Sequence, residues 1–156
     1  LTLCVMVLLT NSENKARLFT QLIVADVLMI VSGYIGEVSI NNAGGGTIVG
    51  WISFALSLVG FIYILMVIYG SLSEAAGDLP EELANQFGFL KNSILLFWII
   101  YPIGYMIPLL GFEGDLLAAR ELVYNIADIF AKVVFGMLAV SIAKKLSLRE
   151  IGQTSY

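Results

Sequence analysis

Two residues four positions apart carry the clearest chemistry in the sequence. Asp128 and Lys132 lie in the stretch LVYNIADIFAKVVFG, residues 122–136. A spacing of four places both side chains on one face of a helix, within reach of each other. One interpretation is a structural ion pair that neutralises two charges. The other is a lysine amine made nucleophilic toward an aldehyde by apolar surroundings, with the carboxylate balancing the cation that results.

A third ionisable residue, Asp26, shares the apolar setting of this pair. It falls, like Asp128 and Lys132, well inside a long apolar run of the sequence. A charged side chain at that depth of a bilayer is costly, so each of the three is a functional candidate. The chain has no histidine and a single cysteine, Cys4. We therefore predict no metal site, no intrachain disulfide and no enzymatic activity.

The composition indicates that the bilayer is the solvent of these residues. Hydrophobic residues make up 59% of the 156 positions and charged residues 13%, and the mean hydropathy is +0.92. Soluble domains usually carry about 25% charged residues. The sequence pI is near 4.6 and no basic cluster is present, which argues against nucleic acid as a partner.

Four apolar runs are long enough to cross a membrane, since a crossing helix needs about 20 residues. They are residues 18–36, 48–70, 89–110 and 118–143. We predict an all-α, polytopic transmembrane helix bundle that forms one domain over residues 1–156.

Polar segments flank and connect these runs. Residues 1–10 are expected to be the end of a helix that begins before Leu1, and residues 144–156 a tail. The expected connections are 11–17, 36–47, 71–86 and 111–121. Segment 36–47, GEVSINNAGGGT, is typical of a turn or short hairpin loop. Pro80 followed by two acids predicts a helix start.

The basic residues predict the orientation. Apart from Lys132, all but one of them fall on the same side of the membrane, and Arg120 is the exception. The six are Lys15, Arg17, Lys91, Lys144, Lys145 and Arg149. Because positive charge concentrates in cytoplasmic segments, the C-terminus is predicted to be cytoplasmic.

The last two runs resemble helices F and G of the microbial (type 1) rhodopsins. The sixth helix of that family carries W-x-x-Y-P-x-x-W/Y, and its seventh carries D-x-x-x-K. LLFWIIYPIGY matches the first pattern with Trp98, Tyr101, Pro102 and Tyr105. Asp128 and Lys132 match the second, with Gly136 following.

A third motif extends the resemblance to the proteorhodopsin branch. MIVSGYIGE, residues 29–37, is similar to the M-x-x-x-GY-x-GE of helix D, which places Met29 and Gly33 at retinal-contact positions. Asp26 matches a helix D aspartate of bacteriorhodopsin-like members that interacts there with helix C. The chain would then cover the end of helix C and helices D to G of a seven-helix fold.

The resemblance implies all-trans-retinal bound to Lys132 as a Schiff base, with Asp128 as a counterion. The aromatic face of the sixth helix would clamp the chromophore, Pro102 would allow a kink, and Gly33 would leave room near the ring. On the fifth helix the register is open. The candidates there are Phe54, Ser57, and Phe61 or Ile62.

The function implied is a light-driven ion pump of a prokaryotic-type plasma membrane, moving protons outward. The alternatives are a sensory rhodopsin, an anion- or sodium-pumping rhodopsin, and a non-photoactive transporter segment in which Asp128 and Lys132 form only a salt bridge. The expected partners are the lipid bilayer and the transported ion, and a homo-oligomer is a further possibility.

Ion choice in this family depends mainly on helix C. The primary counterion is expected before Leu1 and the proton-donor position between Cys4 and Val7. Residues 1–10 contain no carboxylate, which departs from proton pumps with an acidic donor. Three acids near the outer end are interpreted as solvated loop residues. They are Glu113, Asp115 and Glu121.

Overall fold

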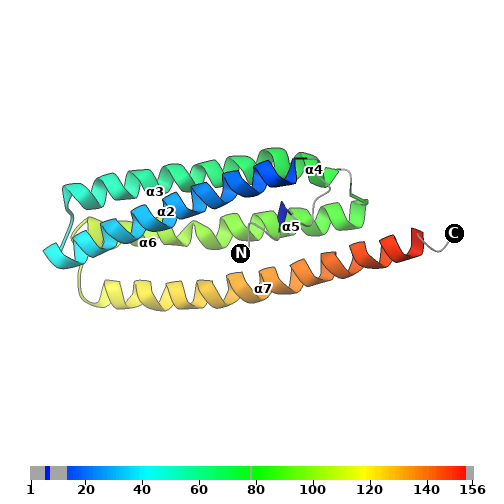
Figure 1. The fold of residues 1–156 in the computed structure, drawn as a ribbon. Coiled ribbons are helices and arrows are strands. Elements are labelled where there is room, and N and C mark those ends of the chain that lie inside the picture. Colours follow the sequence, from blue (N-terminus) through cyan, green and yellow to red (C-terminus); the bar gives the residue numbers. More distant parts are fainter. Residues whose placement is uncertain (1–5, 8–13, 78, 154–156) are drawn as a thin grey trace.

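The structure, a computed structural model, describes residues 6–7, 14–77 and 79–153. Its helices run lengthwise beside one another (Figure 1). They are α2 (Lys15–Ala43), α3 (Ile48–Val67), the π-helix η1 (Ile68–Leu72), α4 (Ser73–Gly77), α5 (Glu81–Trp98), α6 (Ile100–Leu109) and α7 (Asp115–Gln153). The predicted all-α helix bundle is confirmed for this part of the chain.

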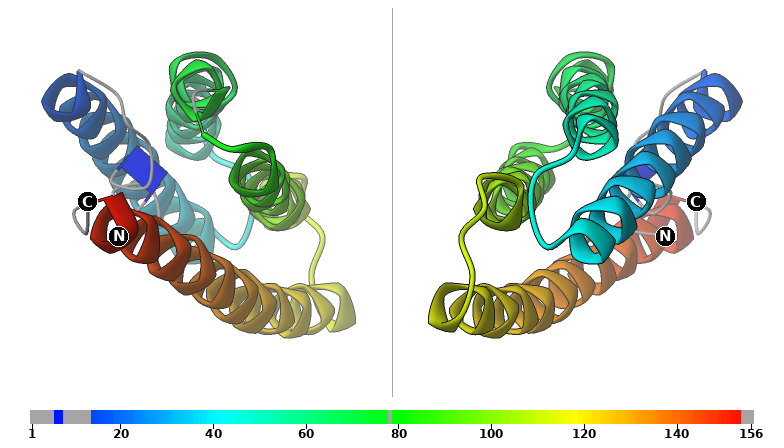
Figure 2. Two further views of the ribbon diagram at one scale, coloured as in Figure 1. Left: turned by 90° about the vertical axis from the view of Figure 1, so that its right-hand side faces the viewer. Right: turned by 90° about the vertical axis from the view of Figure 1, so that its left-hand side faces the viewer.

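Four helical segments are long and apolar enough to cross a membrane. They are Lys15–Ala43, Ile48–Leu72, Glu81–Leu109 and Asp115–Leu148. Seen end-on, α2, α3, the α5–α6 segment and α7 follow one another around a common axis (Figure 2). The expected helix at residues 1–10 falls outside the described residues, except for Met6 and Val7, which are buried in the core.

The connection between α2 and α3 is much shorter than the sequence suggested. Residues 36–43 were expected in a loop, but α2 continues through them and ends at Ala43. Gly44 then takes the left-handed conformation (φ 68°) and its N–H donates to the Ile40 carbonyl, which stops the helix. The side chain of Thr47 accepts a hydrogen bond from the Gly50 N–H and starts α3. The polar side chains of residues 37–43 therefore reflect exposure to solvent at the end of α2, and they do not end the helix.

The same correction applies to the last helix. Residues 115–117 were expected in the connection alone and residues 118–121 in both the connection and the last apolar run, but α7 begins at Asp115. Its C-terminal end includes residues 144–153 of the expected tail. The helix start predicted at Pro80 is confirmed, because α5 begins at Glu81 with two acids in its first turn. Negative side chains at the N-terminal end of a helix interact favourably with its dipole.

The buried apolar side chains form two clusters at opposite ends of the bundle. The larger lies where the start of α2 meets the ends of α3 and α7 and the start of α5, and it includes Leu22, Ile64, Phe87 and Ile142. The smaller cluster at the other end consists of Ile40, Tyr105 and Leu109. The middle of the bundle is therefore the part that the core does not fill.

Two local irregularities interrupt the spanning helices. α5 ends at Trp98 and α6 begins at Ile100, two residues before Pro102. Because proline has no N–H, the bond that residue 102 would donate to the Trp98 carbonyl is not made. At its C-terminal end α3 passes into η1, where the Ser73 hydroxyl donates to the Ile68 carbonyl at 2.9 Å.

Candidate functional site

A cavity of about 450 Å³ lies between the two core clusters. Residues from α2, α3, α5, α6 and α7 line it. All nine positions that the sequence assigned to a cofactor site are among the lining residues, namely Asp26, Met29, Gly33, Trp98, Tyr101, Pro102, Tyr105, Asp128 and Lys132. The fold thus brings together residues that are as many as 106 positions apart, from 26 to 132.

The lysine and the two nearest polar groups form a short chain in the cavity wall. Lys132 Nζ donates to Asp128 Oδ2, and the Tyr101 hydroxyl donates to Asp128 Oδ1. The carboxylate therefore accepts from both α6 and α7. The Lys132 side chain is 74% exposed, so its amine is accessible to a molecule that enters the cavity. An accessible amine held beside a carboxylate can condense with an aldehyde.

Aromatic side chains from α3, α5 and α6 form a further part of the cavity wall. The Tyr105 ring stacks on Phe54 with 5.3 Å between the centroids. Gly36 on α2 makes this possible, because a Cβ there would overlap the Tyr105 hydroxyl. Trp98, half-buried, lines the cavity from the end of α5. Flat, rigid side chains of this kind fix the shape of a narrow apolar pocket.

The structure settles the register of α3. Phe54, Ser57 and Phe61 line the cavity, whereas Ile62 does not and is 43% exposed. Ser57 Oγ also donates to the Met29 carbonyl at 2.9 Å, which joins the α3 wall to the α2 wall. Gly33 lies opposite, and its nearest neighbour across the helices would be the Ser57 hydroxyl at 3.4 Å from an added Cβ.

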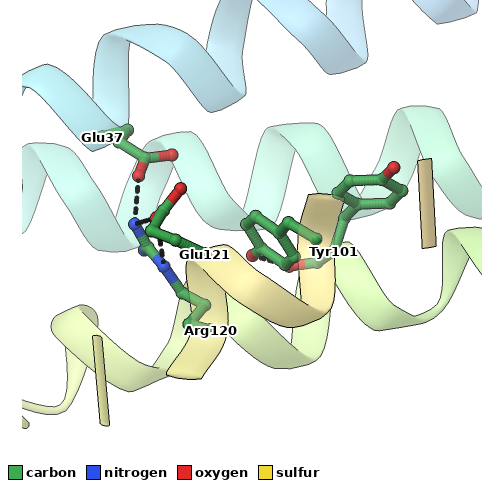
Figure 3. A network of polar contacts seen from close by, with 5 residues as sticks. Glu37, Tyr101, Arg120 and Glu121 are labelled. Carbon is green, nitrogen blue, oxygen red and sulfur yellow. Dashed lines mark hydrogen bonds and ion pairs between the residues drawn. The ribbon is translucent and has the colours of Figure 1, made fainter. Parts of the chain in front are cut away.

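Sequence reasoning missed a second polar network, which lies where the C-terminal part of α2 meets the start of α7 (Figure 3). Arg120 Nη2 donates to Glu37 Oε1 at 3.0 Å and also pairs with Glu121. The Arg120 guanidinium lies 5.4 Å from the centroid of the Tyr124 ring. Glu37 and Glu121 had been placed in loops, and both belong to helices.

Tyr124 connects that network to the lysine site. Its hydroxyl donates to the Tyr101 carbonyl at 2.9 Å, and the two rings lie 5.0 Å apart between centroids. Glu37 and Tyr124 both line the cavity. The signal available in the sequence was Arg120, the one basic residue predicted on its side of the membrane.

The fold and the site together define an integral membrane protein with a largely apolar cavity between its helices, lined by a lysine and a carboxylate. The family model described as "Bacteriorhodopsin-like protein" matches residues 1–146. The chain therefore belongs to the bacteriorhodopsin-like family, and its resemblance to the microbial rhodopsins is confirmed. Members of this family bind retinal as their chromophore.

Two curated relatives illustrate the similarity. The green-light absorbing proteorhodopsin of Gamma-proteobacterium EBAC31A08 is 27% identical over 143 residues, which is 91% of this chain and 55% of the relative. The bacteriorhodopsin of Haloterrigena sp. (strain arg-4) is 34% identical over 131 residues, 83% of this chain and 50% of the relative. The chain thus spans about half the length of the curated relatives it matches.

Solved structures agree on the fold. Exiguobacterium sibiricum rhodopsin superposes with a TM-score of 0.87 at 38% identity, over 94% of this chain and 66% of the other. Xanthorhodopsin, described as a light-driven ion pump with dual chromophore, gives a TM-score of 0.84 at 30% identity, over 96% of this chain and 59% of the other.

Proposed function

We propose that this chain forms a large part of the chromophore site of a light-driven ion pump, with all-trans-retinal joined to Lys132 as a Schiff base. The observation that carries the proposal is the cavity in which Lys132, Asp128 and Tyr101 meet an aromatic wall. Family membership supports it, as does the description of xanthorhodopsin as a light-driven ion pump.

The residues present fit such a group. Lys132 offers an accessible amine, and the pocket around it is mostly apolar and aromatic. Retinal, when bound, supplies light absorption and a change of shape. Asp128 then provides the negative charge beside Nζ, and the Tyr101 hydroxyl fixes the orientation of its carboxylate. The aromatic wall from Trp98 to Tyr105 restricts movement of the bound group.

The break in the spanning segment Glu81–Leu109 supports a movement of α6 against α5. Ile99 separates the two helices, and Pro102 leaves the Trp98 carbonyl without its helical partner. A site that exposes an ion first to one side and then to the other needs such a hinge. We propose outward proton transport, with the C-terminus in the cytoplasm because six of the seven other basic residues lie on that side.

The first experiment tests chromophore binding. The complete reading frame that encodes this chain is expressed with all-trans-retinal, and the membranes are examined for a visible absorption band. Lys132→Ala should abolish the band, and Lys91→Ala is the matched control because Lys91 lies outside the cavity lining. A wild-type protein without a band, or a band that survives Lys132→Ala, would overturn the proposal.

The second experiment separates the kinds of rhodopsin. Illuminated cells that pump protons outward acidify their medium, and a protonophore abolishes the signal. A sensory rhodopsin gives no sustained change. An anion or sodium pump gives a passive proton movement that the protonophore enhances, so the sign and the protonophore response decide among the three.

A further inference from the structure

We propose that Arg120 and Tyr124 are positioning residues for the Lys132–Asp128 pair, acting through Tyr101. This inference rests on the proposed function, because its readout is the colour of the pigment. The four residues of α7 that take part follow one another at intervals of four: Arg120, Tyr124, Asp128 and Lys132. Such a row occupies one face of a helix, and here that face is directed toward the cavity and Glu37.

Arg120 anchors one end of this row. Its side chain is only 8% exposed, and Nη2 lies 3.0 Å from Glu37 Oε1 on α2. A buried guanidinium is costly unless carboxylates pair with it, and Glu37 and Glu121 do so. Within the described part of the chain, Nη1 has no hydrogen-bond partner. Arg120 is therefore held from two sides, by Glu37 across the α2–α7 contact and by Glu121 on its own helix.

Tyr124, one helical turn after Arg120, contacts both Arg120 and the backbone of α6. The Arg120 guanidinium covers its ring, and its hydroxyl donates to the Tyr101 carbonyl at 2.9 Å. Gly104 on α6 provides the space, since a Cβ at that position would overlap the Tyr124 hydroxyl. The ring is held from two sides, by a cation above it and by the α6 backbone beside it.

Tyr101 completes the connection. Its backbone is fixed by Tyr124, and its hydroxyl donates to the carboxylate that faces Lys132. A hydrogen-bond donor disperses the charge of a carboxylate. If Tyr101 shifts, the negative charge next to Nζ becomes more concentrated and favours a positive charge localised at that nitrogen. We therefore expect the visible absorption band to move to shorter wavelength.

Tyr124→Phe is the most direct test, because it removes the hydroxyl and keeps the ring. Tyr63→Phe is the matched control, since Tyr63 is on α3 and outside the cavity lining. We expect Tyr124→Phe to shift the band to shorter wavelength, and bleaching by hydroxylamine to accelerate by about fivefold, the factor that one typical hydrogen bond represents. The control should match the wild type in both.

Arg120→Gln and Glu37→Gln, alone and combined, provide an independent test. If the two side chains act as one unit, the double variant should show the same spectral shift as either single variant, not the sum. A wild type without pigment would count against the proposed function. A coloured wild type whose band is unmoved in Tyr124→Phe and in both Gln variants, even with lower thermal stability, would overturn this inference and leave the proposed function standing.

Discussion

Two of the ion pairs in the described part of the chain each join one basic and one acidic side chain, yet they differ in nearly every other respect. Lys132 and Asp128 are neighbours on α7, four residues apart, with side chains 74% and 44% exposed. Arg120 and Glu37 lie 83 positions apart, join α7 to α2, and are 8% and 36% exposed. The first pair needs only one helix to form. The second exists only once two helices have met.

This difference suits each pair to a different task. A lysine amine is a compact donor that can lose its proton and react, whereas a guanidinium stays charged and binds carboxylates with a rigid planar fork. Lys132 can be modified without disturbing helix packing, because its partner lies on the same helix. Arg120 holds two helices together and has no comparable reactivity.

Exchanging the two basic side chains should give the largest effect. Lys132→Arg preserves a cation beside Asp128 but removes the reactive amine, so we expect complete loss of the visible band in protein that still inserts. Arg120→Lys preserves the charge and should keep the band. Absorption spectra of membranes with matched protein content check this. A pigment in Lys132→Arg would show that the pair is structural only.

Removing the acid from the second pair should destabilise the fold. Glu37→Ala leaves Arg120 with Glu121 alone, and we expect a loss of about 2 kcal/mol, less than for a fully buried pair because Glu37 is partly exposed. Thermal denaturation of the pigment measures it. Glu74→Ala, at an exposed position of α4, is the control. Equal melting temperatures for the two variants would contradict the role given to Arg120.

Glycine substitutions compare the space around the two pairs. Beside the Arg120–Glu37 pair, Gly104→Ala would force Tyr124 away from α6. Overpacking of this kind typically lowers the free energy of unfolding by about 1–3 kcal/mol. The denaturation midpoint should fall, and the band should move in the same direction as in Tyr124→Phe. An unchanged band together with an unchanged midpoint would show that Tyr124 is not closely held.

The smallest effect is expected four residues beyond Lys132. An added Cβ at Gly136 meets no atom within 4 Å in the described residues, so Gly136→Ala should gain up to about 1 kcal/mol from the higher helix propensity of alanine. The same denaturation assay applies. A clear loss of stability would mean that another segment of the protein covers this face of α7.

The residues that line the cavity could be named from the sequence mainly because three stretches resemble helices of the microbial rhodopsins. Spacing alone left open whether Asp128 and Lys132, four residues apart, form only an ion pair. On α3 both Phe61 and Ile62 were candidates, since one residue turns the side chain by about 100° around the helix. The structure places Phe61 in the cavity lining and Ile62 outside it.

The second ion pair could not be predicted in the same way. Glu37 is the second residue of the polar stretch GEVSINNAGGGT, which was interpreted as a loop, and the helix in fact continues to Ala43. Pairing between residues 37 and 120 depends on how α2 and α7 are placed side by side. A single sequence contains no periodicity that reports this placement.

The π-helix η1 has a consequence for the direction of the side chains on either side of it. A π-turn holds one residue more than an α-turn, because its hydrogen bonds run from i to i+5. An extra residue in a regular α-helix would turn everything after it by about 100° around the helix axis. At Ile68–Leu72 the wider turn takes up that residue locally. Ser73 therefore keeps the direction relative to Phe61 that a regular helix one residue shorter would give it.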